Sequence, residues 1–411
     1  MGLFEIIAIL LTLAALFSYV NVRVIKLPTT IGVMVISLAV SLALLVAGRL
    51  GLGLEGVARH VLSSVDLEAT LLHGMLGFLL FAGSLHVNLN DLVEQRWSIG
   101  LLATGGVVVS TVLVAGLTLL AARATGVHLP LLACLLFGAL ISPTDPIAVL
   151  GIMRTARADK RLEVTVAGES LFNDGVGVTV FTVLLVLAAG AHELSTVTVL
   201  ELLAGQAVGG VALGLLLGTA AYQMLKRVDD YQVEIMVTLA VVTGGYAVAE
   251  HLGTSGPLAM VVAGLLVGNH GRAFAMSAST RRHLDTFWEL VDDVLNAVLF
   301  VLIGLEVLVL PVSPRLVLTG LATIPAVLLA RWLSAGGIVA LLRRRRPLPA
   351  GAIRVLTWGG LRGGISVALA LSLPPGPDRA AVVSITYVVV IFSIVVQGLT
   401  VSRLVRATAR S

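Results

Sequence analysis

Charged side chains are scarce in this chain. Asp, Glu, Lys and Arg together make up 12% of its 411 residues, whereas about 25% is usual in soluble domains. Hydrophobic residues make up 58%, and the mean hydropathy is +1.04. This composition excludes a soluble globular domain and predicts an all-α polytopic membrane protein, because a helix satisfies its own backbone hydrogen bonds in lipid.

Cysteine is nearly absent, and so are several functional motifs. Cys134, the only cysteine, lies within an apolar run, so no internal disulfide can form and we expect a small packing residue. The sequence lacks the nucleotide-binding Gly-x-x-x-x-Gly-Lys-Ser/Thr, the Gly-x-Gly-Asp of intramembrane aspartyl proteases and the Thr-Val-Gly-Tyr-Gly filter of potassium channels. These absences argue against ATP use, a cation channel, and a protease dyad of Asp145 and Asp174.

Window hydropathy and helix-breaking residues predict thirteen membrane-spanning segments. They lie near residues 3–20, 30–47, 67–87, 97–121, 130–151, 165–189, 197–225, 232–251, 256–269, 289–309, 316–341, 351–373 and 380–403. The first segment has no Lys or Arg before it, unlike a signal peptide.

The basic residues are dispersed among the predicted loops, so the net charge of +4 indicates no nucleic-acid partner. If the N-terminus lies outside, most of the 27 Lys and Arg residues fall in loops on the inner side. The positive-inside rule then predicts a cytoplasmic C-terminus in a cell membrane. The run Arg343–Arg346 is expected to anchor that side near anionic lipid.

The fifth segment carries Ser142-Pro-Thr-Asp-Pro146 in its middle. Pro143 and Pro146 each lack an N–H and clash with the carbonyl four residues back, so the helix must unwind there. An acid, Asp145, lies between the two prolines. We interpret the combination as functional, because an acid within the membrane is costly.

The twelfth segment is interrupted by glycine instead. Gly359, Gly360, Gly363 and Gly364 surround Arg362. The glycines permit irregular backbone, and the buried Arg362 needs carboxylate or carbonyl partners, which an unwound crossing helix provides.

The two interruptions are separated by the same length of chain as the starts of the segments that precede them. This equal spacing predicts a repeat in which segments 4 to 6 correspond to segments 11 to 13. Six segments lie between the interrupted ones, so the two triplets enter the membrane from opposite sides and the repeat is inverted. Breaks at corresponding positions of two halves indicate a transporter binding site near the bilayer midplane.

The sixth segment begins with Gly168-Glu-Ser-Leu-Phe-Asn-Asp-Gly175. An Asp at a helix centre costs about 2.5 to 3.5 kcal/mol on insertion scales, so Asp174 is a candidate cation and proton site. In a helix, Ser170 and Asn173 lie on the same face as Asp174. Glu169 lies about 140° around the helix from Asp174, and we expect it to belong to a structural ion pair.

Taken together, these residues resemble the monovalent cation/proton antiporters related to sodium/proton exchangers, in the branch with Asn-Asp. The resemblance rests on Pro-Thr-Asp-Pro146, on Glu169 to Gly175, and on Trp358 to Gly364. Two further strings contribute, Ala330-Arg-Trp332 and Leu79-Leu-Phe-Ala-Gly-Ser-Leu-His86. The resemblance extends over nearly the whole chain.

The resemblance implies that Na⁺ and H⁺ bind alternately at Asp174. It implies that Ser170, Thr144 and Asp145 supply oxygen ligands or orient the site. Asn173 is also expected to belong to the ion-binding site. Another branch has a second Asp at this position, and the Asn goes with exchange that moves no net charge.

The resemblance also implies structural roles. Glu169 is expected to pair with Arg331 of the eleventh segment, and Arg362 is expected to balance the charge of crossed half-helices. The chain departs from many relatives in having Ala82 where they carry a Glu, which removes a ligand or gate from the third segment. His86, at the end of that segment, is expected to be an interfacial polar residue.

We therefore expect a secondary antiporter, not an enzyme, that needs no cofactor besides the transported ions. Na⁺ or Li⁺ is the favoured substrate, and K⁺/H⁺ exchange by the same fold is the alternative. Residues 97–189 and 316–403 are expected to form a core that moves against a scaffold of residues 1–87 and 197–309. By resemblance, this scaffold forms the contact of a homodimer.

Overall fold

The computed structural model describes residues 3–50, 69–156, 158–188, 196–272, 275–310, 313–343, 348–349 and 351–409. In these ranges the regular structure is helical, apart from one isolated backbone bridge between Asp145 and Leu361. The expected all-α class is confirmed. Within the same ranges, eight helices are long and apolar enough to cross a membrane, and shorter apolar helices accompany them.

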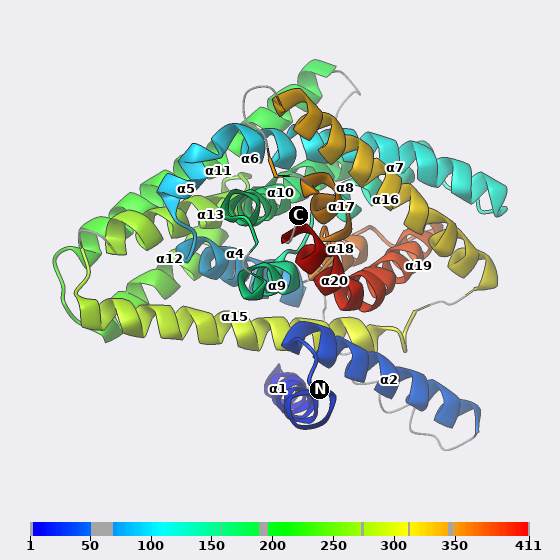
Figure 1. Cartoon of the computed structure of the whole chain (residues 1–411), viewed down its shortest axis with the longest axis horizontal. Helices are drawn as coiled ribbons and strands as arrows, with labels where there is room; N and C mark the ends of the chain where they lie inside the picture. The colour runs from blue at the N-terminus through cyan, green and yellow to red at the C-terminus, as the bar shows by residue number, and fades with distance from the viewer. Residues whose placement is uncertain are drawn as a thin grey trace.

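A first group of helices contains α1 and α2, which lie against the long helix α15 (Figure 1). Its members are α1 (Leu3–Val20), η1 (Asn21–Ile25), α2 (Thr29–Arg49) and α15 (Ala278–Glu306). The contact of α2 with α15 is close: the Ser41 hydroxyl donates to the Gly304 carbonyl at 2.7 Å. A Cβ at Gly304 would lie 2.3 Å from the Ser37 Cβ. Small residues therefore allow the two backbones to approach.

A second group packs beside the first (Figure 1). It comprises η2 (Ala69–Met75), α4 (Leu76–Leu85), α11 (Thr196–Leu225), α12 (Tyr231–His251), α13 (Gly256–Leu266) and η3 (Val267–Gly271). Glycine again permits the closest approach, since a Cβ at Gly214 of α11 would lie 2.5 Å from the Ala259 carbonyl oxygen of α13.

The remaining helices form the third group. They are α5 (Leu89–Glu94), α6 (Arg96–Ala103), α7 (Gly105–Ala124), α8 (Leu131–Ile141), α9 (Ile147–Thr155), α10 (Lys160–Ala188), α16 (Pro314–Leu342), α17 (Ala352–Trp358), α18 (Gly364–Leu371), α19 (Pro377–Phe392), η4 (Ser393–Gln397) and α20 (Gly398–Ala409). Helix α7 packs on α8 and on α16, and α16 packs on α19. Segments distant in the sequence thus form one body around α8, α10 and α18.

Each of the thirteen predicted segments coincides with one helix or with an interrupted run of helices. The largest difference concerns the segment predicted at 289–309, because α15 begins at Ala278. Asp285, Glu289, Asp292 and Asp293 lower the hydropathy of its first half, and the helix there is amphipathic. Residues 344–346 of the arginine run lie outside the described residues.

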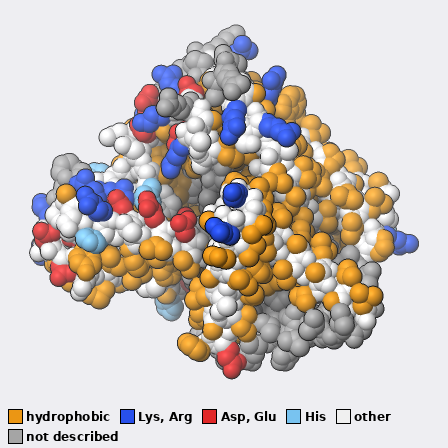
Figure 2. Space-filling view, turned by 60° about the horizontal axis from the view of Figure 1, so that its bottom comes forward, with side chains coloured by type: hydrophobic (Ala, Val, Ile, Leu, Met, Phe, Trp, Pro, Cys, Tyr) orange, Lys and Arg blue, Asp and Glu red, His pale blue; other side chains and the backbone are white. Residues whose placement is uncertain are grey.

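The surface is largely apolar. Figure 2 shows hydrophobic side chains over most of one face, with charged side chains gathered toward one end of it. Exposed large hydrophobic residues include Val112, Val208, Leu216 and Leu341. A surface of this kind is stable only against lipid, so the chain is a multi-pass membrane protein.

Candidate ion-binding site

The two predicted helix breaks meet each other. Helix α8 ends at Ile141 and α9 begins at Ile147, while α17 ends at Trp358 and α18 begins at Gly364. Between them, the Asp145 N–H donates to the Leu361 carbonyl at 2.8 Å, which forms the isolated antiparallel bridge. The unwound pieces of the two half-repeats are therefore in direct backbone contact.

Arg362 lies buried at this crossing. Its Nη1 donates to the carbonyl oxygens of Ser142 at 2.6 Å and Pro143 at 2.8 Å, and its backbone N–H donates to the Ser393 hydroxyl at 2.9 Å. The two carbonyls belong to the freed C-terminal end of α8, where the helix carries partial negative charge. The guanidinium thus satisfies acceptors that lipid could not.

The glycines of the second break provide clearance rather than unusual backbone angles. A Cβ at Gly363 would lie 2.7 Å from the Asp145 Oδ2, and a Cβ at Gly360 would lie 3.1 Å from the Thr144 Cγ2. A Cβ at Gly364 would lie 2.4 Å from a methyl of Leu299. Among the described glycines, positive φ occurs at Gly126, Gly253 and Gly351 but not in this break. Close approach of the two crossings is therefore what requires glycine here.

Helix α10 holds the first break by hydrogen bonds. The Ser170 hydroxyl donates to the Thr144 carbonyl at 2.6 Å, and the Asn173 Nδ2 donates to the Thr144 hydroxyl at 2.9 Å. The Asn173 Oδ1 in turn accepts from the Thr144 N–H at 3.4 Å. Asn173 is fully buried by these contacts and does not line the cavity described next. Its amide positions Thr144.

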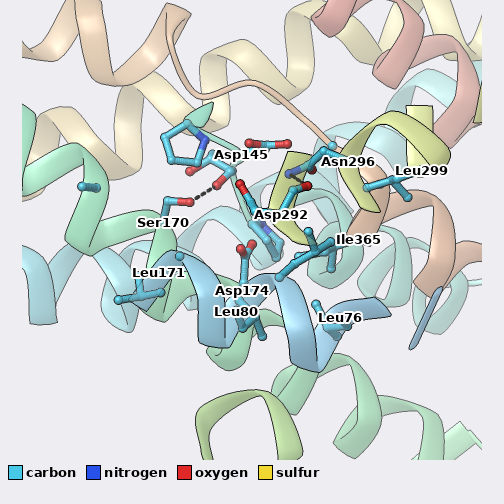
Figure 3. A pocket seen from close by; sticks show the side chains of 18 of the residues that line it. Leu76, Leu80, Asp145, Ser170, Leu171, Asp174, Asp292, Asn296, Leu299 and Ile365 are labelled. Carbon is cyan, nitrogen blue, oxygen red and sulfur yellow. Dashed lines mark hydrogen bonds between the residues drawn. The ribbon is translucent and has the colours of Figure 1, made fainter. Parts of the chain in front are cut away.

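Asp174 faces a cavity of about 160 Å³ beside both breaks (Figure 3). Such a volume holds several water molecules. Its polar lining comes from Thr144, Asp145, Ser170, Asp174, Asp292, Asn296 and Ser366. No Lys, Arg or His of the described chain lines it. Carboxylate and hydroxyl oxygens without a lining cation form an environment suited to a hard monovalent cation.

Glu169 lies on another face of α10 and forms a buried, bidentate ion pair with Arg331 of α16. The Arg331 Nη2 donates to the Glu169 Oε2 at 2.8 Å, and Nη1 donates to Oε1. The Arg331 Nε donates to the Leu356 carbonyl at 3.1 Å. The pair thereby links α10, α16 and α17, away from the cavity.

Sequence reasoning missed two residues of the cavity. Asp292 and Asn296 of α15 point into it together with Asp145 and Asp174 (Figure 3). The signal was present, because two acids and an amide follow one another in Val291-Asp-Asp-Val-Leu-Asn296 at the head of a predicted span. Acids near the end of a span commonly lie at the membrane–water interface, so the sequence alone does not single these residues out.

The third predicted segment contributes only apolar residues to the cavity, among them Leu76, Leu80 and Gly83. Ala82 is buried in α4 outside the lining. His86 follows that helix, its Nδ1 is 3.0 Å from the Ala82 carbonyl oxygen, and its Nε2 is 3.7 Å from the Glu289 carboxylate. His86 does not line the cavity either.

Comparison with known proteins agrees with this architecture. The family model described as "Sodium/hydrogen exchanger, transmembrane" matches residues 9–407. The Na⁺/H⁺ antiporter NhaP of Pseudomonas aeruginosa is 50% identical over 98% of this chain and 96% of its own length. The Na⁺/H⁺ antiporter NhaH of Halobacillus dabanensis is 33% identical over 97% of both chains.

A solved structure shares the fold. The sodium proton antiporter MjNhaP1 from Methanocaldococcus jannaschii superposes with a TM-score of 0.74 over 100% of both chains, at 20% identity. The likeness of fold extends over the full chain.

Proposed function

This chain belongs to the sodium/hydrogen exchanger family, and we propose that it exchanges Na⁺ for H⁺ across a membrane by binding the two alternately at Asp174. One observation carries the proposal. The Asp174 side chain faces a cavity large enough for several water molecules, at the crossing of two interrupted helices, with Asp145 and Ser170 beside it. A transporter, rather than an enzyme, is what this family contains.

A single carboxylate holds either a proton or a sodium ion. Na⁺ prefers oxygen ligands, and Asp174, Asp145, Ser170 and the Thr144 oxygens are at hand for it. When Asp174 is ionised and empty, carrying its charge through the low-dielectric layer is costly. Exchange is then obligatory, because the site crosses readily only when occupied.

The other predicted residues support the site without binding the ion. Asn173 was expected to belong to the ion-binding site, but its amide is bonded to Thr144 and does not line the cavity. The resemblance to the Asn-Asp branch supports the exchange of one Na⁺ for one H⁺ without net charge. Glu169 with Arg331 holds three helices together, and Arg362 satisfies the carbonyls of the first break.

Alternating access would come from motion of residues 97–189 and 316–403 against residues 1–87 and 197–309. In this arrangement the N-terminus is outside, the C-terminus is cytoplasmic, and the scaffold forms a homodimer contact. The mobile body would carry both breaks and α10 together, because the bridge and the Thr144 hydrogen bonds join them.

K⁺/H⁺ exchange remains the alternative substrate choice, and the names of the relatives favour Na⁺. Neither a channel nor a protease is favoured, because the acids line a cavity in a fold shared with antiporters.

The test uses proteoliposomes that contain a pH-sensitive dye and carry an imposed proton gradient. Addition of Na⁺ should dissipate the gradient through the wild-type protein, Li⁺ should do likewise, and K⁺ should do so weakly. Asp174→Asn should abolish the response, because an amide binds neither ion as a carboxylate does. The matched control is Asp378→Asn, at the start of α19 and outside the cavity lining. A normal rate in Asp174→Asn would refute the site assignment.

A further inference from the structure

We infer that Asp292, supported by Asn296, forms a cation-loading station on α15: a monovalent cation, still partly hydrated, pauses at this carboxylate before it reaches Asp174. The inference deepens the proposed function and rests on it. Asp292 binds the incoming ion transiently, while Asp174 and Asp145 bind it for transport.

The station lies on a stripe of α15 that faces the cavity. Asp292, Asn296 and Leu299 are spaced by four and three positions, so they share one face of the helix, and all three line the cavity. Leu299 is the innermost, since its methyl groups abut Gly364 of the second break. Asn296 is buried, and its Nδ2 donates to the Asp292 carbonyl at 2.9 Å. Asp292, one turn farther from the break and only half-buried, is therefore nearer the mouth.

The three acids of the cavity do not act as one chelating cluster. Within the described residues no group of three or more His, Cys, Asp or Glu side chains is arranged to hold one metal ion. Asp292 nevertheless shares the cavity with Asp145 and Asp174 (Figure 3). A separated acid in the same cavity fits a second station on the path better than a further ligand of one site.

Charge favours a cation at this station. Asp292 has no ion-pair partner among the described residues, and the apolar lining of the cavity includes Val87, Leu150 and Leu171. A cavity lined by one sign of charge with low-dielectric walls raises the local concentration of counter-ions. A neutral substrate or an anion would gain nothing from this arrangement.

The next residue provides a matched control. Asp293 lies about 100° around the helix from Asp292, is exposed, and lines hollows near Thr29 rather than the cavity of Asp174. The two residues are adjacent acids on the same helix and differ in the face of α15 on which they lie.

The station is expected to act from only one face of the membrane. Helix α15 packs on α1 and α2, whereas Asp174 and Asp145 belong to α10 and the break after α8. If the two bodies move past each other, Asp292 stays with α15 and the ion site leaves it. Asp292 then assists uptake from the membrane face to which this cavity opens and not from the other.

The experiment measures Na⁺-dependent proton flux in everted and in right-side-out membrane vesicles. Asp292→Asn should raise the KM for Na⁺ by about tenfold or more on one face, with a near-normal maximal rate and an unchanged KM on the other face. Asp292→Glu should retain most of the wild-type KM, and Asp293→Asn should match wild type on both faces. The KM difference should shrink when N-methyl-D-glucamine chloride raises the ionic strength.

A second measurement separates this inference from the antiport proposal. Binding of ²²Na⁺ to purified protein by scintillation proximity does not require exchange. If the wild-type protein shows no exchange but Asp292→Asn still raises the Kd for ²²Na⁺, the station is supported and antiport is refuted. Normal exchange, with KM and Kd both unchanged in Asp292→Asn or equally changed in Asp293→Asn, would overturn the station and leave antiport standing.

Discussion

Thr144 shows how individual side chains hold the unwound backbone beside the cavity. Its carbonyl accepts from Ser170, and its hydroxyl and N–H both bond to the Asn173 amide. The unwound backbone is thus held by neutral hydrogen bonds from α10, which leave Asp174 to face the cavity. On the proposed function, Ser170 and Asn173 of α10 orient the first break, and Asp174 of the same helix binds the ion.

Glu169 gives a residue-scale prediction about stability. In Glu169→Gln the Arg331 guanidinium stays buried without a counter-charge, which typically costs about 3 to 5 kcal/mol. We expect a large drop in folded yield and in the thermal unfolding midpoint of the detergent-purified protein. The control is Glu163→Gln on the same helix, whose partner Arg154 is largely exposed, so that loss should be below about 1 kcal/mol. A stable Glu169→Gln protein without transport would contradict the structural role.

Some acids of the cavity are predictable from the sequence and others are not, for a physical reason. Asp174 was found because it interrupts an apolar run, where an acid is conspicuous. Asp292 has the same chemistry, but the first half of α15 is amphipathic and contains other acids, so its charge stands out less. Whether Asp292 or Asp293 faces the cavity depends on the rotation of α15, which packing against α1 and α2 sets.

At the scale of elements, the two helix breaks were predictable because proline and glycine act locally. The prolines at 143 and 146 prevent a continuous helix whatever surrounds them. The glycines of the second break act differently: their φ angles are ordinary, and their role is visible only once the first break lies against them. The glycines in the sequence place the second break but do not reveal the contact with the first break that requires them.

Gly363 gives the prediction at this scale. In Gly363→Ala the new methyl would lie 2.7 Å from the Asp145 Oδ2, so the crossing must separate or Asp145 must turn. Misplacing a polar group by an ångström costs function steeply, and we expect exchange in proteoliposomes to fall by about tenfold or more. Gly116→Ala on α7 is the control, because beyond its own helix backbone no described atom lies within 4 Å of where a Cβ would be. Wild-type exchange by Gly363→Ala would show that close approach is not required.

On the scale of the whole molecule, the cavity is built between groups of helices. Its acids come from α10, from the break after α8 and from α15, which are far apart in the sequence. In Figure 1, α8 and α10 lie near the middle of the view and α15 runs along its lower side. The face shown in Figure 2 is broadly apolar, whereas the cavity lining includes three acids. Fold class and helix order followed from hydropathy, whereas the shape of this cavity depends on packing.

Voltage provides the whole-molecule prediction. One Na⁺ exchanged for one H⁺ moves no net charge, whereas each net charge would couple about 2.3 kcal/mol per 100 mV to the driving force. We expect the proton gradient reached at a fixed Na⁺ gradient to be the same with and without a valinomycin-set potassium potential. A shift of that final gradient with voltage would rule out electroneutral exchange and point to a second titrating group.

The bridge from Asp145 to Leu361 has an evolutionary consequence. The joint between the two half-repeats is made by the amide of residue 145, while the acid at the same position belongs to the cavity lining. Any amino acid except proline preserves that amide. Descendants of this architecture can therefore change this side chain of the cavity lining and still keep the backbone bond that joins the two breaks.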